Sequence, residues 1–163
     1  MVFFRKYNLT KKVITFTVAC LSLYGVILGI LQYHQGTVPH NLVGEWKLNL
    51  KINSTSYNTY QGMSVGYKLF LNQNGKVITG QGEKWLVNNK EIPFNQHSPI
   101  SMDGTLNGNN LVLSFKLKGS KRETVGAFVL KVQNQNKLVG TFSTTGANSK
   151  GDVVFNKVTA SST

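Results

Sequence analysis

The sequence predicts an all-β fold, an antiparallel up-and-down barrel of about eight strands that is tethered by one N-terminal transmembrane helix. Three observations support this prediction. Residues 13–33 form an apolar run that contains no Asp, Glu, Lys or Arg. From Gly44 onward, apolar and polar residues alternate with a period of two, which is typical of half-buried strands. Hairpin dipeptides of the Asn-Gly type separate the alternating segments.

The apolar run at 13–33 is long enough to cross a bilayer. As a helix it would measure roughly 30 Å, close to the thickness of the hydrocarbon core. It exceeds the apolar region of a cleaved signal peptide and no small-residue cleavage site follows it, so we expect an uncleaved signal anchor, with a cleaved signal as the alternative. Four basic residues precede the run, whereas 34–43 contains no Lys or Arg. The positive-inside rule therefore predicts an inner-membrane or plasma-membrane protein with a cytoplasmic N-terminus and a periplasmic or extracellular C-terminal domain.

These boundaries divide the chain into five parts. They are a basic tail at 1–12, the transmembrane helix at 13–33, a linker at 34–43, the barrel domain at 44–158 and a polar tail at 159–163. Within the helix, Gly25 and Gly29 lie one turn apart on one face, and Ser22 lies one turn before them. Small residues in this spacing let a second helix pack closely. We therefore expect a membrane-protein partner or a homodimer that associates through the helix, and a role as an accessory subunit.

The strands are expected to follow one another with short turns. Asn74-Gly75 and Asn107-Gly108 are the strongest hairpin signals, and Asn88-Asn89 is the expected centre of a short hairpin. The expected strands lie near 44–52, 63–71, 76–84, 99–106, 111–118, 122–132, 138–143 and 152–158, with the short hairpin at 85–94. Because consecutive hairpins of this length twist, the sheet is expected to close on itself, which removes its edges. An eight-stranded barrel has an interior that is filled by side chains or holds one small ligand.

The first strand opens with Gly44-x-Trp46, and the last strand contains Lys157 as its one basic residue. The tripeptide resembles the G-x-W signature that opens the first strand of lipocalins and related calycin barrels such as avidins. The resemblance implies a barrel in which Trp46 plugs one end beneath a basic residue of the last strand, where Lys157 stands in place of the usual Arg. It implies no particular ligand.

Aromatic side chains at strand spacing are candidates for lining a cavity. They are Trp46, Tyr67, Trp85 and Phe128, with Arg122 as a charged anchor for a ligand. The alternative is that the same aromatic residues are ordinary core. On the first interpretation the domain binds a small apolar molecule.

Charge favours anionic partners. After the first four basic residues, 14 Lys and Arg remain against six Asp and Glu, a net charge of +8. An electropositive domain that binds anionic lipid or polysaccharide is therefore an alternative function, whereas nucleic acid is not expected outside the membrane. Cys20 is the one cysteine and lies in the apolar run, so no disulfide is expected in the domain.

Catalytic patterns are sparse. Gly62-x-Ser64-x-Gly66 matches the spacing of a nucleophile elbow, but that motif needs a strand, a turn and a helix, and the residues after Ser64 have a strand pattern. A hydrolase with Ser64, Glu91 and His97 as its triad is therefore kept only as a minor alternative. The three histidines have no ligand spacing with each other, so neither a metal nor a cofactor is expected. We expect a protein that acts by binding rather than as an enzyme.

Overall fold

The computed structural model describes residues 40–119 and 123–159, which form β-strands and three single-turn 3-10 helices. The strands are β1 (Gly44–Ser54), β2 (Ser64–Asn74), β3 (Val77–Val87), β4 (Lys90–Glu91), β5 (Ser98–Asn107), β6 (Asn110–Lys118), β7 (Glu123–Asn134), β8 (Lys137–Thr144) and β9 (Lys150–Lys157). The 3-10 helices are η1 (Asn58–Tyr60), η2 (Phe94–Gln96) and η3 (Gly146–Asn148). In the two described ranges, no helix has the length and apolar character needed to cross a bilayer. The transmembrane helix predicted at 13–33, with Ser22, Gly25 and Gly29, lies outside the described residues.

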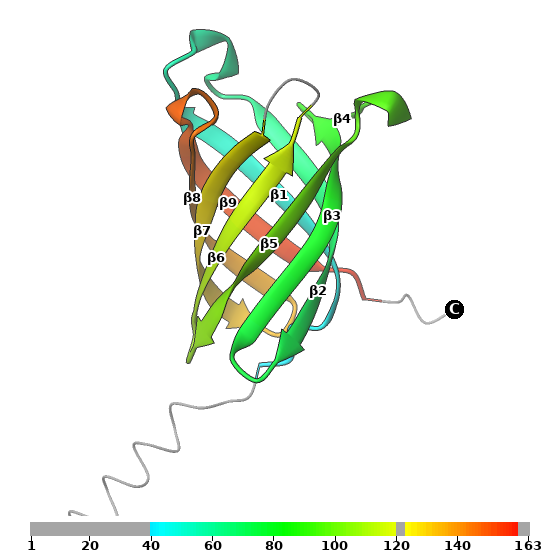
Figure 1. The fold of residues 1–163 in the computed structure, drawn as a ribbon, viewed down its shortest axis with the longest axis vertical. Coiled ribbons are helices and arrows are strands. Elements are labelled where there is room, and N and C mark those ends of the chain that lie inside the picture. The colour runs from blue at the N-terminus through cyan, green and yellow to red at the C-terminus, as the bar shows by residue number, and fades with distance from the viewer. Residues whose placement is uncertain (1–39, 120–122, 160–163) are drawn as a thin grey trace, which may run out of the picture. The chain divides into compact units, whose positions relative to one another are not determined.

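Eight strands close into one antiparallel barrel (Figure 1). Around the ring the order is β2-β1-β9-β8-β7-β6-β5-β3, and pairing of β3 with β2 completes it. The two-residue strand β4 pairs with β3 alone. Each long strand is thus hydrogen bonded on both sides, and the ring has no free edge. The predicted all-β fold of about eight antiparallel strands is confirmed.

The turns use the residues that the sequence predicts for them. Gly75 and Gly108 have φ angles of 58° and 57°, and Asn88 and Asn89 have φ angles of 49° and 61°. Asn88 and Asn89 are both central residues of their turn, whereas Gly75 and Gly108 are each the first residue of a two-residue loop, because Asn74 pairs with Val77 and Asn107 pairs with Asn110. Tight hairpin turns require positive φ at one or both central positions, and Asn and Gly adopt it most readily. The strand registers follow from these turns, because a two-residue loop fixes which residues face each other.

Alternation of the side chains builds the core inside the barrel. Trp46, Phe128 and Phe155 are among the largest fully buried side chains. The ring of Phe128 stacks on Phe115 with 4.4 Å between centroids and meets Phe155 edge-on at 5.5 Å. These three rings therefore join β6, β7 and β9 through the centre of the barrel, and such aromatic pairs stabilise a core beyond their buried area.

The barrel is bent where glycine faces inward. An added Cβ at Gly140 would overlap the carbonyl oxygen of Val129 on the neighbouring strand β7. Only a residue without a side chain allows the two backbones to approach this closely. Gly140 thus marks a point at which strand β8 curves around the barrel, a role that bends in small barrels require.

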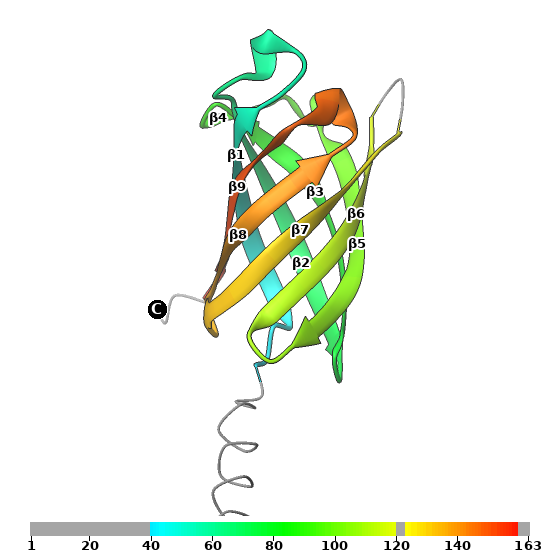
Figure 2. The ribbon, with the colours of Figure 1, turned by 90° about the vertical axis from the view of Figure 1, so that its left-hand side faces the viewer.

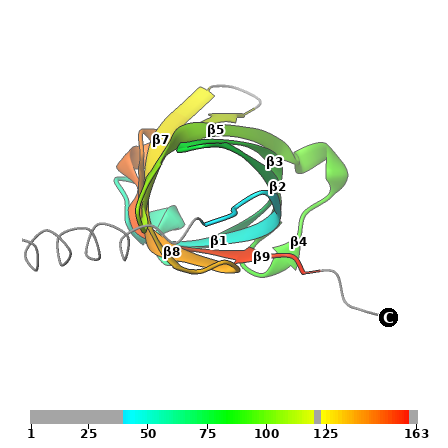
Figure 3. The same cartoon turned by 90° about the horizontal axis from the view of Figure 1, so that it is seen from below.

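The two ends of the barrel differ. At one end the segment before β1 crosses the barrel, and Leu42 on this segment is fully buried (Figure 3). The Trp46 indole Nε1–H donates a hydrogen bond of 2.8 Å to the Leu42 carbonyl oxygen. This bond joins the segment before β1 to the Trp46 side chain. The helices η1 and η3 lie at the opposite end (Figure 2), and Figure 1 shows η2 at this end as well. We call the end at Trp46 the closed end and the other the mouth.

Candidate functional site

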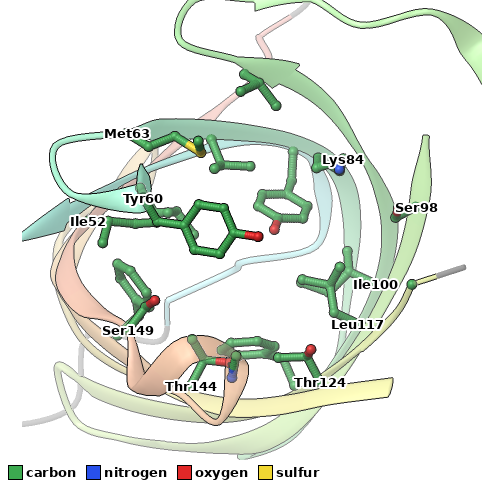
Figure 4. Close-up of a pocket in the computed structure, with 18 of the residues that line it drawn as sticks. Ile52, Tyr60, Met63, Lys84, Ser98, Ile100, Leu117, Thr124, Thr144 and Ser149 are labelled. Atoms are coloured by element: carbon green, nitrogen blue, oxygen red, sulfur yellow. Dashed lines mark hydrogen bonds between the residues drawn. The ribbon is translucent and has the colours of Figure 1, made fainter. Parts of the chain in front are cut away.

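A cavity of about 420 Å³ lies inside the barrel toward the mouth (Figure 4). Its inner walls are apolar and include Leu50, Ile100, Phe115, Phe128 and Phe142, all of which are buried. Pockets for small molecules commonly measure about 300–1,000 Å³ and are lined mainly by apolar side chains. The cavity therefore has the size and lining of a small-molecule site.

Hydrogen bonds between loops shape one side of the mouth. The backbone N–H and the hydroxyl of Ser56, in the loop after β1, donate to the Ala147 carbonyl oxygen at 2.7 and 2.8 Å. The buried Ser149 hydroxyl donates to Thr55 Oγ1 at 3.1 Å. These bonds tie the loop after β1 to η3, and so they hold the position of Tyr60, which lies in the same loop.

Tyr60 extends across the mouth. Its ring points over the cavity between Met63 on one side and Thr144 on the other (Figure 4). The ring is 37% exposed and meets Tyr57 edge-on, with 5.0 Å between centroids. Tyr60 thus lies at the opening of the cavity and narrows it.

One wall of the cavity carries a polar row. Lys84 on β3 is the direct cross-strand partner of Tyr67 on β2 and of Ser98 on β5. All three line the cavity, and Lys84 and Ser98 lie on the same side of it in Figure 4. Among the lining residues that the structure describes, Lys84 alone carries a charge. We call Tyr67, Lys84 and Ser98 the polar row.

A change of register next to the polar row sets the direction of Trp85. Gly66 pairs with Leu86, whereas the next residue, Tyr67, pairs with Lys84, so Trp85 is the extra residue of a β-bulge. The Trp85 ring lies beneath the Lys68 ammonium, with 3.9 Å between Nζ and the ring centroid. Lys68 is exposed, and Trp85 is therefore part of the outer surface and does not line the cavity.

The predicted ligand-binding residues are placed in different parts of the barrel. Tyr67 and Phe128 line the cavity. Trp46 is 1% exposed at the closed end, and Trp85 lies on the outer surface. Arg122 lies outside the described residues. The sequence did not single out Lys84 and Ser98. Lys84 nevertheless continues the alternation of the inward-facing residues Ile78, Gly80 and Gly82.

The Tyr67 hydroxyl is a hydrogen-bond donor inside the barrel. The side chain is 4% exposed, and burial raises the pKa of Tyr67 well above its ordinary value. The phenol is therefore neutral and carries its proton across the physiological range. Within residues 40–119 and 123–159, no protein group is hydrogen bonded to this hydroxyl.

The residues of the alternative hydrolase triad have other contacts. Ser64 begins strand β2, and its backbone N–H donates to Asn88 Oδ1 at 3.0 Å. The His97 ring lies with Nδ1 3.2 Å from Glu83 Oε1 and Nε2 3.2 Å from the Ile92 carbonyl oxygen. His97 is therefore held by neighbouring groups rather than fully solvated. In the part of the chain that the structure describes, no group of three or more metal-ligating side chains forms.

Comparison with protein-family models and with curated proteins finds no match. Solved structures with a similar fold include a redesigned β-barrel at a TM-score of 0.56 and 9% identity, covering 72% of this chain and 92% of the other. Two further redesigned β-barrels, mFAP0 and mFAP1, were solved with DFHBI bound. The first has a TM-score of 0.53 and 6% identity, covering 71% of this chain and 98% of the other. The second has a TM-score of 0.54 and 7% identity, covering 72% and 94%. At these identities the likeness is one of fold.

Proposed function

We propose that the protein binds a small, largely apolar molecule inside its barrel. The observation that carries this proposal is the cavity of about 420 Å³, which has apolar inner walls and a mouth at the end opposite Trp46. A barrel filled completely by side chains would leave no such space. The fold is compatible with this role, since mFAP0 and mFAP1 each hold the small molecule DFHBI.

The experiment is to identify small molecules that co-purify with the full-length protein. The protein is extracted under native conditions and denatured, and the released compounds are identified by mass spectrometry. Leu117→Trp places a large ring in the cavity, which Leu117 lines. Val112→Trp is the matched control, since Val112 lies on the same strand β6 and is 49% exposed on the outer surface.

The expected result is about one molecule of a common chemical class per chain in the wild type and in Val112→Trp, and little in Leu117→Trp. Circular dichroism and a cooperative melt would establish that both variants are folded. If the folded Leu117→Trp protein released the same compounds in the same amounts as the wild type, the cavity would not be their binding site, and the proposal would fail.

We also propose that residues 13–33 anchor this barrel in a membrane with the barrel outside the cytoplasm. The support is the uncharged run of 21 residues and the basic residues that precede it. Protease added to intact cells or spheroplasts should digest the barrel, while a cytoplasmic control protein stays intact. A barrel that is cut only after the membrane is permeabilised would contradict this topology.

A further inference from the structure

The polar row places three hydrogen-bond donors at one level of the cavity. Tyr67, Lys84 and Ser98 are consecutive cross-strand partners on β2, β3 and β5, and all three face inward. Directly paired residues in antiparallel strands have Cβ atoms about 4.5–5.5 Å apart. The phenol, the ammonium and the hydroxyl are therefore presented together on one wall.

The charge of Lys84 has no counterpart in the described protein. Lys84 is half-buried, and no carboxylate in residues 40–119 or 123–159 lies within ion-pair distance of its ammonium. The described lining residues include neither Asp nor Glu. A cation at the edge of an apolar cavity loses hydration, and an anion beside it offsets that loss.

The hydroxyl of Tyr67 is the second polar group of the row. It carries its proton, and Tyr67 lines the cavity, so the hydroxyl can donate a hydrogen bond to a molecule held there. A hydrogen bond from a neutral donor to an ionised acceptor is stronger than one between two neutral groups. Lys84 and Tyr67 together favour a ligand group that is negatively charged and accepts hydrogen bonds.

We infer that the ligand of the cavity is an amphipathic organic acid, whose acidic head contacts Lys84 with Tyr67 and Ser98, and whose apolar body packs on Phe115 and Phe128. The wall opposite the polar row includes the buried rings of Phe128 and Phe142, which match such a body, together with the hydroxyl side chains of Thr124, Thr144 and Ser149. This inference rests on the proposed binding function and adds to it the sign of the ligand's charge and the residue that selects it.

The test compares three probes that share a ten-carbon chain: decanoate, decan-1-ol and decyltrimethylammonium. Each is titrated into the full-length protein at pH 8 by isothermal titration calorimetry, below its micelle concentration. The proteins are wild type, Lys84→Met, Lys84→Arg and Lys116→Met. Lys116 is the matched control because it is exposed on the outer surface of β6. All samples contain the same detergent at the same concentration. Partition of a probe into detergent micelles is therefore the same for every variant and does not affect the comparison between variants.

The inference expects wild type and Lys116→Met to bind decanoate about tenfold more tightly than decan-1-ol, and decyltrimethylammonium most weakly. The preference should vanish in Lys84→Met and largely return in Lys84→Arg, while decan-1-ol binds all four proteins alike. If decanoate and decan-1-ol bind with the same ratio in wild type and Lys84→Met, the proposed function stands and the assignment of an acidic ligand is overturned. If no probe binds any variant, both are overturned.

Discussion

The Lys157 ammonium lies over the ring of Trp46, with 5.7 Å between Nζ and the ring centroid, at the closed end of the barrel. The same ammonium donates a hydrogen bond of 3.1 Å to the Asn41 carbonyl oxygen. Gly44 makes room for this arrangement, because an added Cβ would lie 3.0 Å from Lys157 Cε and its φ of 135° strains other residues. The contact expected from the resemblance to calycin barrels is thus present, with lysine as the basic residue.

Trp46→Ala should lower the free energy of unfolding by about 3–5 kcal/mol, because it removes a fully buried ring and leaves a cavity at the closed end. Trp46→Phe should cost less, since it keeps an aromatic ring and loses mainly the hydrogen bond to Leu42. Urea denaturation followed by circular dichroism measures both. Trp85→Ala is the control on the outer surface, and a Trp46→Ala protein no less stable than this control would contradict the role of Trp46 as a plug.

Gly140→Ala should destabilise the barrel by about 3 kcal/mol, because the new methyl group meets the Val129 carbonyl oxygen and the backbone must shift. The neighbouring Thr141→Ala is the control, since Thr141 is exposed and its truncation should change the stability by no more than about 0.5 kcal/mol. Thermal melts of the two variants compare them directly. Equal midpoints would show that β8 does not depend on close approach at this bend.

Tyr67→Phe should change the dependence of stability on pH. Burial raises the pKa of Tyr67, so above about pH 10 an unfolded chain releases the phenolic proton while the folded chain keeps it. The wild type then binds more protons when folded, and its stability falls as the pH rises beyond that point. Urea denaturation from pH 8 to pH 11 should show similar stability for both proteins at pH 8 and a steeper alkaline loss for the wild type. Parallel curves would mean that Tyr67 does not titrate differently in the two states.

Gly25→Ile concerns the predicted transmembrane helix, which lies outside the described residues. A branched side chain on the small-residue face would block close packing of a second helix, while isoleucine keeps the segment apolar. If the protein is an accessory subunit or a homodimer, the variant should lose partner co-purification or self-association in detergent, and the barrel should melt as in the wild type. Unchanged association would remove the support that Ser22, Gly25 and Gly29 give to such a partner.

Strand positions were predictable because local signals agreed with the overall fold. The alternation from Trp46 to Ile52, the dipeptides Asn74-Gly75 and Asn107-Gly108, and the pair Asn88-Asn89 each specify one structure at short range. Closure of the ring was also predictable from the sequence, because a twisted sheet of consecutive hairpins removes its edges when it closes.

The polar row was not predictable in the same way. Lys84 follows Gly80 and Gly82, which give no apolar signal for the inward face, and the bulge at Gly66 and Tyr67 breaks the alternation at Trp85. Trp85 was therefore expected to line the cavity, whereas the structure places Lys84 in the lining and Trp85 on the outer surface. A bulge changes the direction of side chains without a distinct sequence signature, so only the register of the paired strands reveals it.

The pairing of β1 with β9 has a consequence for folding. It joins Trp46 to Lys157, so the ring cannot close until strands far apart in the sequence have met. Non-local pairings of this kind slow folding, and all-β domains that depend on them commonly take milliseconds to seconds. During synthesis, β1 and β8 would expose unpaired edges until β9 has emerged from the ribosome. This interval is when a newly made chain is most open to aggregation, and when a chaperone that covers strand edges would matter most.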